Sequence, residues 1–202
     1  MALRAALGDS DFVSIRRQGA AYVDKTHAVA ALATSATKVT LFTRPRRFGK
    51  STLLSTLEAF FQRPEVAGDT APLFADLAVW RDDEARQHHQ RYPVLTLSFK
   101  DAQARTWRAT LESLRDHIAS AVRRLKILED DALSPLLAAR ITRMCTYGED
   151  EATLQNSVHL LCEALSTRTG QPVVLLIDEY DSPLHAAWQH GYLDEALGFF
   201  RA

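Results

Sequence analysis

The sequence predicts an α/β fold in which a mostly parallel sheet is covered by helices on both faces. Three short apolar stretches have the composition of buried strands, at residues 38–42, 92–99 and 172–178. Between and after them, apolar residues recur every three or four positions, which is the spacing of one helix face. Strands that alternate with helices favour parallel pairing, with a layer of helices on each side of the sheet.

Length and composition are those of one globular domain, which we assign to residues 1–202. The chain has 202 residues, a formal net charge of −1 and 24% charged residues, which excludes a generally basic nucleic-acid-binding protein. No stretch approaches the roughly 20 apolar residues of a membrane span, and the N-terminus lacks the apolar run of a signal peptide. Cys145 and Cys162 lack metal-ligand spacing. We therefore expect a cytoplasmic protein with no membrane partner.

The first half of the chain is predicted to contain a helix, a strand and a second helix. Asp24 is a candidate N-cap for the alanine-rich helix that follows it. The sequence KVTLF from Lys38 is short, β-branched and apolar, as expected of a buried strand. Helical spacing returns after Lys50, but residues 63–91 contain mixed turn signals and no regular structure is predicted there. The apolar positions of the second helix are Leu53, Leu54, Leu57, Phe60 and Phe61.

The second half repeats the alternation of strands and helices. Pro93 stands at the mouth of the second strand, where its missing N–H is tolerated. A long helix is predicted over residues 107–125, and Ser134 with Pro135 forms an N-cap and first-turn pair for another. Residues 154–165 predict a further helix. The third and most apolar strand lies in PVVLLIDEYD.

The loop after the first strand has most of a phosphate-binding motif. Gly49, Lys50 and Ser51 match the end of G-x-x-x-x-G-K-[ST], whereas Arg44 occupies the position of the first glycine. In such a loop, backbone N–H groups and a helix N-terminus converge on the anion, and the lysine adds positive charge. The hydroxyl of Ser51 is then a candidate magnesium ligand, which Thr52 supports. By itself the motif is equally compatible with an ordinary helix start.

Two carboxylates at the end of the third strand form a candidate second half of the site. Asp178 and Glu179 follow four apolar residues, and open parallel sheets bind ligands at the carboxyl ends of their strands. Asp178 would hold magnesium, and Glu179 would polarise the water that attacks the terminal phosphate. The alternative is that both carboxylates only mark the point where a strand reaches the surface.

Arg44 is followed by a proline and two further arginines. Pro45 disfavours helical geometry at Arg44 and fixes its own φ, so proline stiffens a loop that glycine would loosen. Arg46 and Arg47 add charge next to the expected phosphates. Three roles stay open for these arginines: phosphate clamping, contact with nucleic acid or an acidic partner, and simple solvated charge.

These segments together resemble the bacterial AAA-ATPase-like family, whose phosphate loop typically has the sequence R-P-R-R-F-G-K-S. The resemblance rests on YVDKT, RPRRFGKSTLL, LFADLAVW, YPVLTLSFKD and LIDEYDSPL, which span Phe12 to about Arg201. It implies a three-layer P-loop NTPase fold, ATP and Mg²⁺ as ligands, a Walker A loop, a Walker B strand and hydrolase activity. The missing first glycine is then a feature that the family shares.

Residue by residue, the resemblance implies phosphate contacts from Gly49 and Lys50, magnesium contacts from Ser51 and Asp178, and a catalytic glutamate at Glu179. The YVDKT segment precedes the first strand, which suggests that one of its polar residues lies near the nucleotide base. An ordinary helix cap is an equal alternative. The complete set of nucleotide-binding candidates is Arg44, Pro45, Arg46, Arg47, Phe48, Gly49, Lys50, Ser51, Thr52, Tyr22, Asp24 and Lys25.

The chain departs from the family pattern at its end, LGFFRA. Family members resemble larger proteins that continue through two more strands and often join a nuclease-like domain of the PD-(D/E)xK type. We therefore expect a fold truncated before the fourth and fifth core strands, with unpaired strand edges and exposed apolar side chains.

Three functions follow as hypotheses. The first is an ATP-binding domain in which hydrolysis, in the complete protein, drives or switches an attached module. The second is a nucleotide-switched module that binds nucleic acid or protein. The third is a non-functional truncated remnant. Whether the chain turns over ATP efficiently by itself, and whether it assembles into oligomers, stays open.

Overall fold

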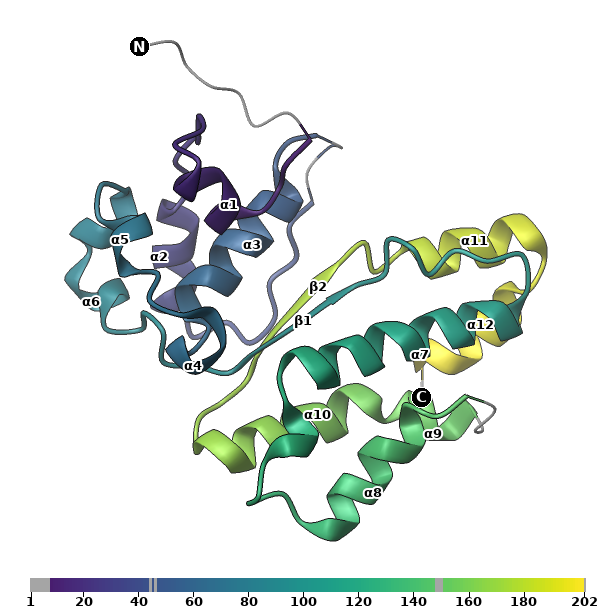
Figure 1. The fold of residues 1–202 in the computed structure, drawn as a ribbon. Coiled ribbons are helices and arrows are strands. Elements are labelled where there is room, and N and C mark those ends of the chain that lie inside the picture. The colour runs from purple at the N-terminus through teal and green to yellow at the C-terminus, as the bar shows by residue number, and fades with distance from the viewer. Residues whose placement is uncertain (1–7, 44, 46, 148–150, 202) are drawn as a thin grey trace. The chain divides into compact units, whose positions relative to one another are not determined.

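The computed structural model describes residues 8–43, 45, 47–147 and 151–201. It is an α/β structure with a small parallel sheet and many helices (Figure 1). The α/β class predicted from the sequence is therefore confirmed. The chain divides into two compact units, residues 1–94 and residues 95–202.

The first unit is mainly helical. Its longer helices are α1 (Phe12–Arg17), α2 (His27–Ala33) and α3 (Lys50–Phe61). Four short segments follow, although no regular structure was predicted there: α4 (Pro64–Ala67), α5 (Ala71–Phe74), the 3₁₀ helix η1 (Ala78–Arg81) and α6 (Asp83–Arg86). Each has four residues, and α4 and α5 carry a local start signal, a proline in the first turn.

An aromatic core holds these helices together. The rings of Phe12 in α1 and Phe74 in α5 stack with their centroids 4.6 Å apart, and Phe60 in α3 meets Phe74 edge to face at 5.3 Å. The backbone N–H of Phe12 also donates to Ser55 Oγ at 2.9 Å. The first turn of α1 is therefore fixed on α3, the helix that follows the candidate loop.

The end of α3 is tied to the chain that enters the sheet. Gln62 forms an isolated parallel bridge with Tyr92. Its side-chain amide both donates a hydrogen bond to the backbone of Val94 and accepts one from it. Nε2 of Gln62 donates to Val94 O at 3.0 Å, while Val94 N donates to Oε1 at 3.2 Å. Because Gln62 is buried, this reciprocal pair satisfies groups that would otherwise destabilise the fold.

The predicted buried strand at residues 38–42 is wrong. The structure assigns no strand there, and Val39 and Leu41 are 84% and 61% exposed. The sheet in the described part of the chain contains only β1 (Val94–Ser98) and β2 (Val174–Asp178). An apolar β-branched sequence forms a strand only when another strand accepts its backbone hydrogen bonds, so residues 38–42 remain irregular.

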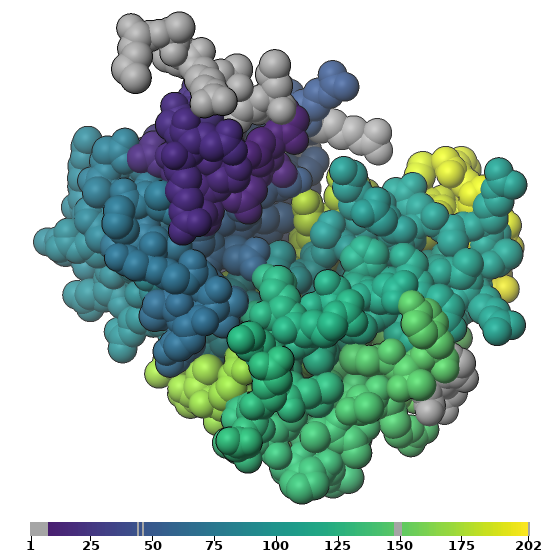
Figure 2. Space-filling model, in the orientation of Figure 1, coloured from purple at the N-terminus to yellow at the C-terminus, as the bar shows by residue number. Residues whose placement is uncertain are grey.

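In the second unit, helices pack against the sheet. After β1 come α7 (Trp107–Arg124), η2 (Ile127–Glu129), α8 (Pro135–Met144), α9 (Glu151–Gln155) and α10 (Ser157–Thr169), and β2 is followed by α11 (Ser182–His190) and α12 (Leu193–Arg201). Leu95, Leu97 and Phe99 pack with the apolar faces of α7, α8 and α10 in one core. On the face that Figure 2 draws, the teal and green segments of this unit form one continuous surface.

Most predicted elements of this unit are confirmed. β1, β2 and α7 match the predicted segments closely, and Ser134 caps α8 by accepting a hydrogen bond from Leu137 N at 3.3 Å. The predicted helix at 154–165 is divided, because α9 ends at Gln155 and α10 begins at Ser157. Apolar periodicity continues through this break, so the sequence pattern alone does not reveal it.

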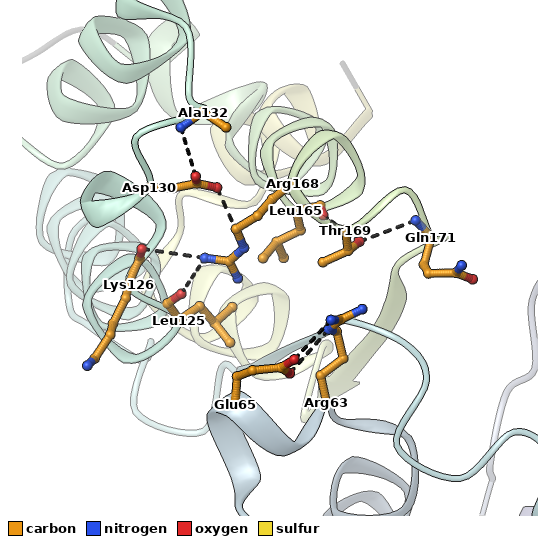
Figure 3. A network of polar contacts seen from close by, with 10 residues as sticks. All are labelled: Arg63, Glu65, Leu125, Lys126, Asp130, Ala132, Leu165, Arg168, Thr169 and Gln171. Atoms are coloured by element: carbon orange, nitrogen blue, oxygen red, sulfur yellow. Dashed lines mark hydrogen bonds and ion pairs between the residues drawn. The ribbon is translucent and has the colours of Figure 1, made fainter.

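Arg168 joins α10 to the end of α7 (Figure 3). Its Nη1 donates to the backbone oxygens of Leu125 and Lys126 at 3.0 and 3.5 Å, and its Nε lies 3.8 Å from Asp130 Oδ2. The last carbonyls of a helix have no partner within the helix and carry partial negative charge. The guanidinium therefore satisfies the end of α7.

Candidate functional site

The loop before α3 contains two residues with left-handed backbone conformation. Gly49 is the N-cap of α3, with φ 75° and ψ 31°, and Arg47 has φ 67°. Glycine adopts this conformation without steric cost, whereas arginine adopts it only at a cost. Backbone conformations of this kind cluster at ligand sites, where they aim N–H groups at an anion. The first N–H groups of a helix point out of its N-terminal end, and in α3 they belong to the residues that follow Gly49.

A hollow of about 410 Å³ lies next to this loop. Among the described residues that line it, the cations are Lys25 and Arg47, and the acid is Asp9. Its volume is within the usual range for small-molecule pockets. The complete described lining is Asp9, Ile15, Ala21, Tyr22, Val23, Lys25, Arg47, Phe48, Gly49, Thr52 and Leu53.

The structure brings Tyr22 and Lys25 to the loop, although 20 or more residues of sequence separate them from it. Thr56 Oγ1 donates to Thr52 O at 2.8 Å, so the contact of 3.2 Å with Tyr22 must use the phenol as donor. Burial raises the pKa of Tyr22 above its ordinary value. Lys25 Nζ donates to Phe48 O at 3.1 Å. Both side chains thus contact residues of the loop or of α3.

Asp24 does not line the hollow. Its Oδ1 accepts hydrogen bonds from Thr26 N and Thr26 Oγ1, at 2.8 and 2.7 Å, and its Oδ2 accepts from Ala78 N at 2.8 Å. Burial raises the pKa of Asp24, but these hydrogen bonds outweigh it and leave the pKa below its usual value. The N-cap of α2 is Thr26, so the prediction that Asp24 is the N-cap is wrong. Instead, Asp24 forms a local turn over Thr26 and ties it to the first residue of η1.

The remaining candidates of the loop do not line the hollow among the described residues. Lys50 and Ser51 form the first helical residues of α3, are half-buried, and do not belong to the described lining. Pro45 is exposed and lies outside regular structure. Arg44 and Arg46 lie outside the described residues.

The carboxylate pair stands at the end of β2, as the sequence predicts. Asp178 is the last residue of the strand, and its backbone oxygen accepts from Phe99 N at 3.0 Å. Glu179 has a left-handed conformation, with φ 50°. Its N–H donates to Asp178 Oδ1 at 3.1 Å, and its Oε2 accepts from Ser182 Oγ at 3.2 Å. The turn after β2 therefore orients both carboxylates by hydrogen bonds.

Five residues that line the hollow were not predicted: Asp9, Ile15, Ala21, Val23 and Leu53. Asp9 accepts hydrogen bonds from Ser14 Oγ and Asp11 N, at 2.6 and 2.9 Å, and these lower its pKa, the bond from Ser14 most. An acid five residues before a serine at a helix start is a weak sequence signal. Ile15 and Leu53 belong to the apolar periodicity of α1 and α3. Such periodicity indicates that a helix face is buried, but it does not distinguish a face that packs in the core from one that lines a pocket.

A family profile described as "AAA-ATPase_like: Predicted AAA-ATPase" matches residues 6–202. The chain belongs to this predicted AAA-ATPase family. A curated protein of Azotobacter chroococcum mcd 1, "Uncharacterized protein in vnfD 5'region", is 34% identical over 164 residues. The match covers 81% of this chain and 26% of that protein, so the chain spans about a quarter of its relative's length. No solved structure matches the chain significantly.

An AAA-ATPase that uses Mg²⁺ needs few protein ligands for the metal. In the described ranges, no three or more His, Cys, Asp or Glu side chains are grouped so that they could hold a metal ion. Mg²⁺ usually keeps several waters and takes one or two protein oxygens together with substrate phosphates. The hydroxyl of Ser51 and the carboxylate of Asp178 are oxygen donors of that type, so the chemistry of these donors fits magnesium.

In the part of the chain that the structure describes, no helix combines the length and the hydropathy that a membrane crossing needs.

Proposed function

We propose that this chain is an ATP-binding domain of the P-loop NTPase type, which binds the phosphates of Mg-ATP at the N-terminus of α3. The observation that carries the proposal is the hollow beside the loop. Lys25, Arg47 and Gly49 line it where α3 begins, so positive charge and helix N–H groups occur together. Phosphate binding at helix N-termini uses this combination.

Each candidate residue has a role in this proposal. Gly49 gives the loop its left-handed turn, Lys50 supplies charge to the outer phosphates, and Ser51, supported by Thr52, provides a hydroxyl for magnesium. Magnesium, when bound, neutralises charge that develops on the phosphates. Arg44, Pro45 and Arg46 are proposed to complete the loop, next to Arg47 and Phe48.

The carboxylates of β2 are proposed to serve hydrolysis. Asp178 is the second protein ligand of magnesium, and Glu179 accepts a proton from the attacking water. The left-handed backbone at Glu179 and the hydrogen bond from Ser182 support an oriented carboxylate. In the complete protein, hydrolysis would drive or switch an attached module, with a nucleic acid or another protein as partner.

A thermal melt with and without Mg-ATP tests the proposal. Ligand at a hundred times its dissociation constant stabilises the folded state by about 2.7 kcal/mol, which raises Tm by roughly 5–10 °C for a chain of this size. Lys50→Ala should abolish the shift. Glu179→Gln should keep the shift and lose ATP turnover, because that side chain acts in the chemical step.

The exposed Lys38 provides the control, because Lys38→Ala removes the same charge outside the described lining of the hollow. A cooperative melt that Mg-ATP does not shift, in wild type and Lys38→Ala alike, contradicts the proposal. Loss of ATP binding in Glu179→Gln contradicts the role given to Glu179.

A further inference from the structure

Lys25 contacts the loop at the residue before Gly49, where the chain turns into α3. Its Nζ donates to Phe48 O at 3.1 Å. A β-carbon added at Gly49 would lie 3.1 Å from the same Nζ, which is tighter than ordinary packing. The ammonium group therefore lies directly over the backbone of the left-handed turn.

The rest of the YVDKT segment fixes the position of Lys25. Thr26 is fully buried, and its Oγ1 accepts from Val79 N at 3.0 Å. Asp24 holds Thr26 and Ala78, as described above, and the phenol of Tyr22 is engaged with Thr56. Three polar residues of the segment thus hold the backbone and the packing in place. Lys25 is the residue of this segment that carries positive charge into the hollow.

We propose that Lys25 is a second phosphate-binding lysine, which contacts the phosphate chain of the nucleotide and not its base. This inference rests on the proposed function of the hollow. An ammonium group has three donors, and the bond to Phe48 O uses one of them. The other two are available to an anion that also reaches the first N–H groups of α3.

Of the two ends of a nucleotide, the charged phosphates are a better partner for the ammonium group of Lys25 than the neutral base. Hydrogen bonds between charged partners are about twice as strong as neutral ones, so an ammonium group gains most from a charged oxygen. An adenine ring is neutral, and a neutral donor would serve it as well. The position of Nζ beside the left-handed Gly49 is also the place where a phosphate would meet the helix N-terminus.

A competition experiment separates the two ends of the nucleotide. Dissociation constants of Mg-ATP and of inorganic tripolyphosphate, which has no base, are measured for wild type, Lys25→Gln and Lys25→Arg. Gln retains a donor for Phe48 O but lacks the charge. We expect Lys25→Gln to weaken both ligands by about tenfold or more, because a charged hydrogen bond is lost. Lys25→Arg should retain most of the affinity for both.

The control is Lys38→Gln, which makes the same substitution at an exposed lysine outside the described lining. It should leave both dissociation constants unchanged. If Lys25→Gln weakens Mg-ATP but not tripolyphosphate, the lysine serves the base and the inference is overturned. Unchanged binding of both ligands to Lys25→Gln overturns it as well. An equal loss in Lys25→Arg would also overturn it, because the charge would then not be what matters.

The proposed function fails in a different way. If wild type binds neither ligand, or Lys50→Ala binds both as wild type does, the proposed function is contradicted. The inference about Lys25 fails alone when Lys50→Ala loses both ligands and Lys25→Gln retains them. Circular dichroism melts of each variant confirm that the compared chains are folded.

Discussion

Gly49 illustrates how much of the site depends on the conformation of one residue. Its φ of 75° is a left-handed conformation, and an added β-carbon would lie 3.1 Å from Lys25 Nζ. Alanine at this position would therefore meet two obstacles. The first is the backbone cost of about 1–2 kcal/mol for a left-handed residue. The second is a tight contact with Nζ of the lysine that we propose for phosphate binding, which has to shift slightly.

Gly49→Ala is predicted to lower stability by about 1 kcal/mol and to weaken Mg-ATP binding at least tenfold. Gly191→Ala is the matched control, because Gly191 has φ 80° and ψ 24° and nothing within 4 Å of an added β-carbon. The control should show a similar loss of stability and unchanged ATP affinity. Thermal melts and binding isotherms of the two variants measure both quantities. Equal ATP affinity in Gly49→Ala and wild type would contradict the proposed crowding.

Among the helices, the half-buried guanidinium of Arg168 connects α10 to the end of α7. The side chains of Arg168 and Asp130 are 25% and 17% exposed, and Arg168 also satisfies two carbonyls at the end of α7. Arg168→Met should destabilise the chain by about 1–3 kcal/mol, because it leaves these acceptors without their donor. Chemical denaturation measures this free energy of unfolding.

Arg63 and Glu65, which Figure 3 also draws, provide the comparison. This pair is at 3.0 Å, but its side chains are 34% and 62% exposed. Exposed ion pairs stabilise by only about 0–1 kcal/mol, so Arg63→Met should cost less than Arg168→Met. A larger loss in Arg63→Met would show that the contacts of Arg168 with the end of α7 contribute little.

The elements that the sequence predicts correctly are those whose signals are local. The apolar periodicity of α3 and α7, the cap of α8 and the apolar run of β2 all lie within the segment concerned. Residues 38–42 carry an equally clear strand pattern, yet a strand also needs a partner, and the pattern contains no information about the partner. Short helices such as α5 and α6 have too few residues for a periodicity.

The same distinction applies to the candidate site. The motif identifies Gly49, Lys50 and Ser51, because their spacing along the chain is fixed by the loop itself. Asp9 and Ala21 line the hollow from irregular segments before and after α1, which carry no periodic signal. Lys25 was a candidate by position, but its contact with Phe48 O comes from tertiary structure. Sequence thus predicts the loop, and packing determines what surrounds it.

At the scale of the whole chain, the two predicted halves of the ATP site belong to different compact units. The loop is in residues 1–94, and Asp178 and Glu179 are in residues 95–202. Apolar side chains are exposed in both predicted site strands, at Val39 and Leu41 in the first and at Leu175 and Ile177 in the second. Exposed apolar side chains are expected where strands lack neighbours. The proposal therefore assigns the phosphate contacts to residues 1–94 and the carboxylates for magnesium and water to residues 95–202.

Amide hydrogen exchange tests these two assignments separately. With saturating Mg-ATP, exchange is predicted to slow at residues 47–56, where the loop and α3 bind phosphate, and at residues 177–183, where Asp178 binds magnesium. With ATP and EDTA, only the first segment should be protected, because the second responds through the metal. The N–H of Glu179, which donates to Asp178 Oδ1, is a direct reporter of that carboxylate.

Asp178→Asn supplies the matched variant, since it preserves the shape of the side chain and the acceptor for Glu179 N while it removes the charge. Protection of residues 47–56 by Mg-ATP should persist in this variant, and protection of residues 177–183 should be lost. Protection of both segments regardless of metal would mean that the turn after β2 senses the nucleotide without magnesium. Absence of any effect at residues 177–183, with the loop fully protected, would separate the carboxylates from the ATP site and leave the loop as the entire binding site.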